Sequence, residues 1–188
     1  MTEGRQRIRW KPACLRLAAA LLLLAMGVHQ PRAEVMTEDQ VKAAYLYNFA
    51  KFVEWPTEEF SSPDAPMQFC VLDDRPIESG LNQLTKDKKI EGHPLSVATV
   101  QNAEAARDCH IVFISSTQAA SVRRIIDTLH DKRALTVGET QGFLDSGGMI
   151  NFVMENDHVR FEVNHRAAVK AGLHISSRLL VVAKRVIE

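Results

Sequence analysis

Two adjacent carboxylates, Asp73 and Asp74, directly follow a short apolar run, Gln68 to Leu72, which predicts a buried strand. Open α/β sheets bind ligands at the carboxyl ends of their strands, so this position suits a ligand site or a phosphoacceptor pair. The alternative is a solvated strand exit, because acidic residues are common in the loops that follow strands. The residues alone favour the solvated exit.

Histidine is the other residue type that could do chemistry, and six histidines follow residue 33. They are His93, His110, His130, His158, His165 and His174. No two of them are spaced four residues apart, and none has a cysteine or histidine at zinc-finger spacing. The sequence therefore predicts no metal site, although ligands that converge across the fold remain the alternative.

Recognisable catalytic motifs are missing from the sequence. It contains no Cys-x-x-Cys, no G-x-G-x-x-G after the first strand, no phosphate-binding lysine loop and no G-x-S-x-G. We therefore predict no catalytic residue, no cofactor and no enzyme activity. Gly138, Gly142, Gly147 and Gly148 frame one segment, which predicts turns, with a backbone anion nest as the alternative.

The N-terminus has the features of a secretory signal peptide. Basic residues precede an apolar stretch from Leu17 to Val28, which is shorter than the roughly 20 residues of a membrane-spanning helix. Ala33 offers a small residue at a cleavage point before Glu34. We expect residues 1–33 to be removed and residues 34–188 to form one exported domain; the alternative is an uncleaved anchor. Export also argues against a phosphoacceptor role for the two aspartates, since phosphate donors are cytoplasmic.

Charge and cysteine content further narrow the classes of partner and the compartment that suit this chain. The chain has 23 basic and 23 acidic residues, but residues 1–33 hold six of the basic and one of the acidic residues, which leaves residues 34–188 with a net charge of −5. An acidic domain is a poor candidate for nucleic acid or anionic lipid. Cys70 and Cys109 are the cysteines that remain after cleavage, and an oxidising compartment favours a disulfide between them over two buried thiols.

These residues must be positioned by an alternation of helices and strands. The predicted helices span Glu38–Val53 (with a capping box from Thr37 to Gln40), Pro76–Lys86, Gln118–His130 (capped by Ser116-Thr117), Arg166–Ala171 and Ser177–Ile187. The predicted strands span Gln68–Leu72, Leu95–Val100, His110–Ser115, Ala134–Val137, Met149–Glu155 and His158–Val163. The alternation predicts an α/β fold, a three-layer sandwich around a mostly parallel sheet, followed by a C-terminal β-hairpin and terminal helices.

Three segments carry a resemblance to a known family. They are VKAAYLYNFAKFVEWP, VGETQGFLDSGGMINFVMENDHVRFEVN and HRAAVKAGLHISSRLLVVAKRVIE. Together they resemble the YfiR-like family of small exported proteins, over about Thr37 to Ile187. The resemblance places a family disulfide at Cys70 and Cys109. A second, shorter-range cystine of some members has no counterpart here.

The resemblance implies regulation in the periplasm. Such a protein represses an inner-membrane diguanylate cyclase through the cyclase's periplasmic sensor domain, and so controls cyclic di-GMP and biofilm formation. It also implies sequestration by an outer-membrane lipoprotein, and homodimers. We expect the partner-binding patch near the hairpin and the final helices, at Arg160, Glu162 and Arg178. A periplasmic small-ligand sensor that uses the sheet edge near Asp73 and Gly138 is the alternative function.

Overall fold

The computed structural model describes residues 36–188, which form one compact unit. The predicted signal peptide and its cleavage point lie outside the described residues. The first helix, α2 (Glu38–Phe52), begins with the predicted capping box: Thr37 accepts a hydrogen bond from the backbone N–H of Gln40, and the Gln40 side chain accepts one from the N–H of Thr37. Among the described residues, no helix is long and apolar enough to cross a membrane.

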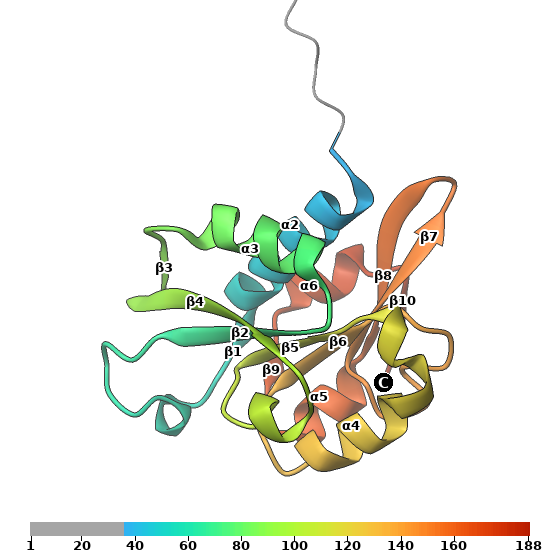
Figure 1. Ribbon diagram of the computed structural model, residues 1–188. Coiled ribbons are helices and arrows are strands. Elements are labelled where there is room, and N and C mark those ends of the chain that lie inside the picture. Colours follow the sequence, from blue (N-terminus) through green and yellow to red (C-terminus); the bar gives the residue numbers. More distant parts are fainter. Residues whose placement is uncertain (1–35) are drawn as a thin grey trace, which may run out of the picture. The chain divides into compact units, whose positions relative to one another are not determined.

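The centre of the molecule is an eight-stranded sheet with the order β10-β8-β7-β6-β5-β2-β4-β3 (Figure 1). Its strands are β2 (Met67–Leu72), β3 (Lys89–Ile90), β4 (His93–Val100), β5 (Ile111–Ile114), β6 (Leu135–Gly138), β7 (Ile150–Glu155), β8 (His158–Asn164) and β10 (Arg185–Ile187). The run from β4 through β2, β5 and β6 to β7 is parallel, and only β3 and β8 pair antiparallel to their neighbours β4 and β7. The predicted α/β fold with a mostly parallel sheet is therefore confirmed.

Helices cover both faces of the sheet because the connections between parallel strands must cross over. The chain passes from β2 to β4 through α3 (Arg75–Thr85), and from β5 to β6 through a 3-10 turn (Ser116–Ser121) and α4 (Val122–Leu129). In Figure 1, α2 and α3 lie on one face and α4 on the other. The α-helix predicted from Gln118 thus begins only at Val122. Its predicted cap is wrong, because Ser116 and Thr117 lie in the preceding 3-10 turn and the Thr117 hydroxyl donates to Asp73.

Side-chain alternation along the central strands creates two cores. Phe69, Val71 and Phe113 point into the core beneath α2, where Phe49 packs edge-on against Phe161 with ring centroids 5.0 Å apart. Their strand neighbours point into a second core beneath α4, which also contains Cys70 and Cys109. Phe49 of α2 therefore serves packing, whereas the adjacent Asn48 is exposed.

The predicted hairpin is present. β7 and β8 pair through six residues each, and the two turn residues, Asn156 and Asp157, have φ values of 50° and 60°. Two successive positive φ values define the type I′ turn that suits the twist of paired strands. Asn164 then caps α5 (His165–Lys170), because its Oδ1 atom accepts a hydrogen bond from the N–H of Ala167.

The C-terminus differs from the prediction of one helix to Ile187. Helix α6 (Ser177–Val182) is capped by Ser176 and ends early, and the last residues form β10, which pairs parallel with β8. The residues of β10 include Val186 and Ile187, whose branched side chains suit a strand, and β8 offers a free edge to pair with. Upstream, β9 (His174–Ile175) pairs with β1 (Val53–Glu54) in a small second sheet that the sequence did not predict.

Candidate functional site

The two aspartates predicted as a ligand position lie at the switch point of the sheet, where β2 neighbours both β4 and β5. Asp74 caps α3, since its Oδ1 accepts a hydrogen bond from the N–H of Ile77 at 3.1 Å. Asp73 has a φ of 55° and accepts a hydrogen bond from Thr117 at 3.3 Å. Both carboxylates therefore have local structural roles. Burial raises the pKa of Asp74, with the nearby charges of Asp39 and Glu139 acting in the same direction against the Ile77 hydrogen bond.

The strongest electrostatic feature of this edge is a three-residue network that the sequence analysis missed. The Lys42 ammonium lies 2.6 Å from Glu139 and 2.5 Å from Glu38. Glu139 follows β6 and also accepts a hydrogen bond from the Ser116 N–H at 2.7 Å. The network therefore connects α2 to the ends of β5 and β6. The available signal was a lysine four residues after Glu38 on an otherwise apolar helix face.

Burial and pairing act against each other in this network. Burial lowers the pKa of Lys42, but the hydrogen bonds to Glu139 and Glu38 outweigh burial, so the Lys42 pKa lies above its usual value. Burial likewise raises the pKa of Glu139, but the bonds from Lys42 and Ser116 bring that pKa below its usual value. Both groups stay charged near neutral pH, so neither is a free general acid or base.

A cleft of about 950 Å³ opens beside this network. Its walls include the start of α2, the end of β6 and residues Phe152 to Met154 of the hairpin. Asn151 also lines the cleft; it is only 6% exposed, and its Oδ1 atom has no hydrogen-bond partner. Within residues 36–188, no group of three histidine, cysteine or acidic side chains is placed to hold a metal ion. The cleft thus offers charge and shape for binding.

The three residues predicted to bind a partner lie on two elements. Arg160 and Glu162 lie on β8, where Arg160 is 3.8 Å from Glu155 and Glu162 accepts a 2.8 Å hydrogen bond from Arg185. Arg178 lies on α6 and is exposed. In the described part of the chain, no ion pair or side-chain hydrogen bond connects Arg178 with the other two residues. The structure therefore does not bring the three together through direct polar contacts.

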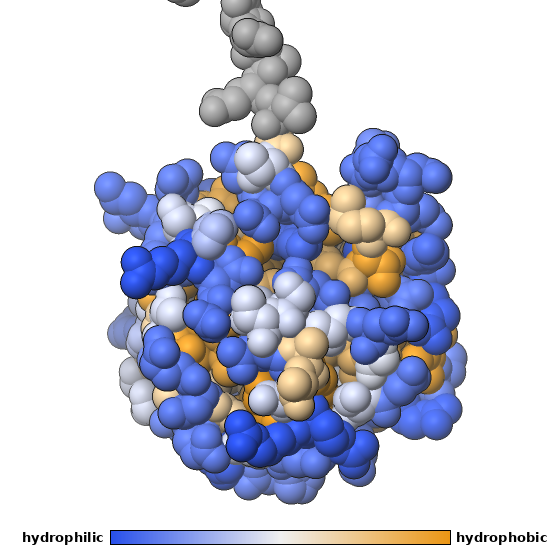
Figure 2. All heavy atoms as spheres, turned by 45° about the vertical axis from the view of Figure 1, so that its right-hand side comes forward, coloured by the Kyte–Doolittle hydropathy of each residue, from blue (hydrophilic) through white to orange (hydrophobic). Residues whose placement is uncertain are grey.

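Helix α6 leaves part of an apolar run in solvent. Its sequence SRLLVV contains four consecutive apolar residues, and a short helix buries only one face. Leu179 is buried, whereas Val181 is 83% and Val182 is 59% exposed. We call these two valines the α6 apolar edge. Figure 2 shows a different aspect of the surface, the side of the hairpin, where apolar areas are separated by polar ones.

The glycine-framed segment has a packing role. The ring of Phe143 is fully buried, and a Cβ atom added to Gly138 or Gly148 would lie 2.4 or 2.1 Å from it. Such distances are far below van der Waals contact, so both positions require glycine for the ring to fit. This packing accounts for two of the four glycines without an anion nest.

Cys70 and Cys109 form the disulfide expected from the sequence, with Cα atoms 6.0 Å apart. Cys70 lies on β2 and Cys109 directly precedes the start of β5, so the bond joins neighbouring segments of the second core. It closes a loop across 39 residues of sequence. The disulfide thus crosslinks the second core, beneath α4, which lacks the large aromatic cluster of the core beneath α2.

Comparisons with known proteins place these features in context. A family model described as YfiR/HmsC-like matches residues 39–184. No curated protein matches the chain. Two solved structures share the fold: a conserved domain protein from Vibrio cholerae O1 biovar El Tor (TM-score 0.53, 11% identity, 80% of this chain covered) and an ABC domain in complex with L-Trp from Streptococcus pneumonia (TM-score 0.52, 10% identity, 79% covered). The aligned part spans 60% of each of those two chains.

Proposed function

The chain belongs to the YfiR/HmsC-like family, whose members are periplasmic regulators of diguanylate cyclases, and we propose that it represses an inner-membrane diguanylate cyclase by binding the cyclase's periplasmic domain. The observation that carries this proposal is the family match, which spans residues 39–184 of a compact unit that begins at Met36. Family members are regulators rather than enzymes. The ion pairs of Lys42 with Glu38 and Glu139 are consistent with that role, since they connect α2 to the sheet edge within the fold.

Repression of this kind needs differential affinity and no bond-making. A binding protein shifts a partner's equilibrium only by the ratio of its affinities for the two states. Moving a cyclase from 99% active to 99% inactive requires a ratio of about 10⁴. The repressor must therefore present a rigid surface that fits one state, and the disulfide between β2 and the start of β5 supports such rigidity.

We place the main contact surface at the α6 apolar edge, next to Arg178. The two adjacent valines give a partner an exposed apolar surface to cover, and arginine is enriched at the centres of interfaces. Arg160 and Glu162 on the hairpin form a second, separate candidate contact. Glu162 is largely occupied by Arg185, which makes Arg160 the more available of the two.

The direct test is repression in cells. Deleting the gene is expected to raise cellular cyclic di-GMP in a strain that expresses the cognate cyclase, and an unchanged level would overturn the proposal. Val181→Asp should weaken binding to the cyclase's periplasmic domain by about tenfold or more, because it puts a charge into an apolar contact. Val169→Asp is the matched control, since Val169 is 57% exposed but lies on α5. Arg178→Glu and Arg160→Glu then separate the two candidate contacts.

Location and assembly complete the proposal. We propose cleavage before Glu34, a mature periplasmic domain of residues 34–188, homodimers, and release of the cyclase when an outer-membrane lipoprotein sequesters the repressor. Intact mass of protein from the periplasmic fraction tests the cleavage, and sedimentation tests the dimer. Recovery of the full-length chain from the cytosol would contradict the location.

A small-ligand sensor is the second candidate function. The cleft at the sheet edge and the unpartnered Oδ1 of Asn151 favour it. Thermal unfolding against a panel of periplasmic metabolites should show a stabilising compound whose effect disappears in Asn151→Ala. A flat response across the panel would remove this candidate.

A further inference from the structure

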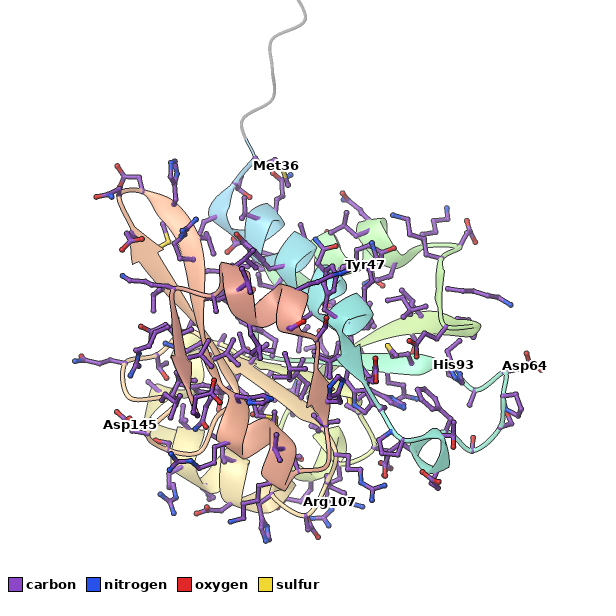
Figure 3. The ribbon with its side chains drawn as sticks, turned by 180° about the vertical axis from the view of Figure 1, so that it is seen from behind. Met36, Tyr47, Asp64, His93, Arg107 and Asp145 are labelled. Atoms are coloured by element: carbon purple, nitrogen blue, oxygen red, sulfur yellow. A yellow bond between two sulfur atoms is a disulfide. The ribbon has the colours of Figure 1, made fainter. Side chains whose placement is uncertain are left out.

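The opposite edge of the sheet holds a stack of rings that none of the functions above uses. Phe60 belongs to the exposed loop between β1 and β2, and its ring lies between two imidazoles. The centroid of the Phe60 ring is 3.7 Å from that of His93, with the rings nearly parallel, and 4.5 Å from that of His110. Trp55 packs edge-on against the other side of this cluster, 6.2 Å from His110. Figure 3 labels His93 beside the loop that carries Asp64.

The hydrogen bonds fix which nitrogen of each imidazole carries a proton. His93 Nδ1 lies 2.8 Å from the carbonyl oxygen of Ala65 and therefore donates to the loop. His110 Nδ1 lies 3.1 Å from the backbone N–H of Gln68 and therefore accepts. The proton of neutral His110 is thus on Nε2, which is buried without a hydrogen-bond partner. A second proton would have to go onto Nδ1 and would break the bond from Gln68.

The surroundings of His110 also oppose a positive charge. The lining of a small cavity beside it includes three basic residues and two acidic ones: Arg107, Lys132, Arg133, Glu59 and Asp108. Glu59 is occupied by Arg133 at 2.9 Å. Burial lowers the pKa of His110, and the charge of His93 lowers it further, while Glu59 acts in the opposite direction.

We infer that the loop from Thr57 to Pro66 is an acid-released latch, closed while His110 is neutral and opened when a proton binds to His110 Nδ1. The proton removes the Gln68 hydrogen bond and places a charge in a buried position, a cost that attraction to the face of the Phe60 ring offsets only in part. Opening the loop returns His110 to water, where the charge costs little. This device acts on the chain itself and does not depend on the proposed function.

The sign of the effect follows from linkage. The pKa of His110 is lower in the closed state than its ordinary value of 6.5, so closure is fully favoured above that value. The preference for the closed state decreases as the pH falls below 6.5 and is lost once the pH is below the closed-state pKa.

His110→Asn is the decisive variant, because the Asn Oδ1 atom can replace Nδ1 as the acceptor for Gln68 but does not titrate. Chymotrypsin cleavage after Phe60 is measured in the wild type and the variant at pH 7.5 and 5.5, which cancels the pH dependence of the protease. Cleavage reports the population of the open loop when opening is fast. The ratio of wild-type to variant rate is expected to rise as the pH falls from 7.5 to 5.5, by up to about tenfold, the limit that one proton with an open-state pKa of 6.5 allows. A ratio that does not change with pH would overturn the latch.

A second measurement covers the case in which the variant does not fold. In the wild type, NMR should give a His110 pKa below 6.5 and a loss of contacts between the Phe60 and His110 rings over the same pH range. A His110 ring that titrates while Phe60 stays stacked would overturn the proposal. So would unstacking at a pH where His110 remains neutral.

Discussion

The two edges of the central sheet are held by opposite electrostatic means. At the carboxyl edge, Lys42 forms ion pairs with Glu38 and Glu139. At the amino edge, His110 is held uncharged between aromatic rings, next to a disulfide. An ion pair is broken by acid only when its carboxylate is protonated. A buried neutral imidazole takes up a proton at much milder acidity, and its contribution to stability is lost there. One sheet therefore has an acid-resistant edge and an acid-sensitive edge.

Removing one member of the charged network should have the largest effect on stability. Lys42→Met leaves the carboxylate of Glu139 nearly buried without its cation, which typically costs about 3–5 kcal/mol. Chemical denaturation measures the loss. The double variant Lys42→Met/Glu139→Gln is the control, because removing both charges should cost clearly less than removing one. Equal losses in the single and double variants would mean that pairing is not what holds this edge.

Removing the disulfide next to the amino edge should have the second-largest effect on stability. The double variant Cys70→Ala/Cys109→Ala should lower the free energy of unfolding by about 2–4 kcal/mol, since the reduced chain regains the entropy of a loop of about 40 residues. Denaturation of the oxidised wild type against the variant gives this number. Adding reductant should bring the wild type to the level of the variant and leave the variant unchanged. Free thiols found by mass spectrometry in protein kept without reductant would contradict the bond.

The sequence was sufficient to predict the local elements of both edges, but it was insufficient to predict the contacts between distant segments of the chain. Apolar runs predicted β2 and β5, and two closely spaced strand patterns predicted the hairpin of β7 and β8, because each of these signals lies within a few neighbouring residues. The run LLVVAKRVI is compatible with either helix or strand, and the free edge of β8 decides where α6 ends. The choice between helix and strand depends on tertiary pairing with β8, so the periodicity of the sequence could not decide it.

The side-chain contacts of the two edges could not be predicted from the sequence for the same reason. Lys42 and Glu139 are 97 residues apart, and Phe60 meets His110 across 50 residues. No local pattern marks either pair. The two aspartates, in contrast, were visible as a motif, and the structure gives Asp74 a capping role that a local rule describes.

Acid unfolding should separate the two edges into two pH ranges. The pKa of His110 is lowered in the folded protein, so its contribution is present above 6.5 and decreases as the pH falls below that value. The pKa of Glu139 is also lowered, so its contribution is present above 4.5 and decreases only as the pH falls below that value. Stability measured from pH 8 to 3 is expected to fall in two steps. His110→Asn should remove the upper step and keep the lower one, and a single step in both proteins would contradict the contrast between the edges.

The smallest predicted effect tests whether every acid at the carboxyl edge acts through charge. Asp74 caps α3 through one hydrogen bond from Ile77, so Asp74→Ala should cost about 1 kcal/mol. Asp74→Asn keeps a capping oxygen and removes the charge. Because burial and the neighbouring carboxylates already raise the pKa of Asp74, losing the charge should be close to neutral or slightly stabilising. A loss in Asp74→Asn as large as that in Asp74→Ala would show that the carboxylate charge itself is needed, and would extend the charged network of Lys42 and Glu139 to the end of β2.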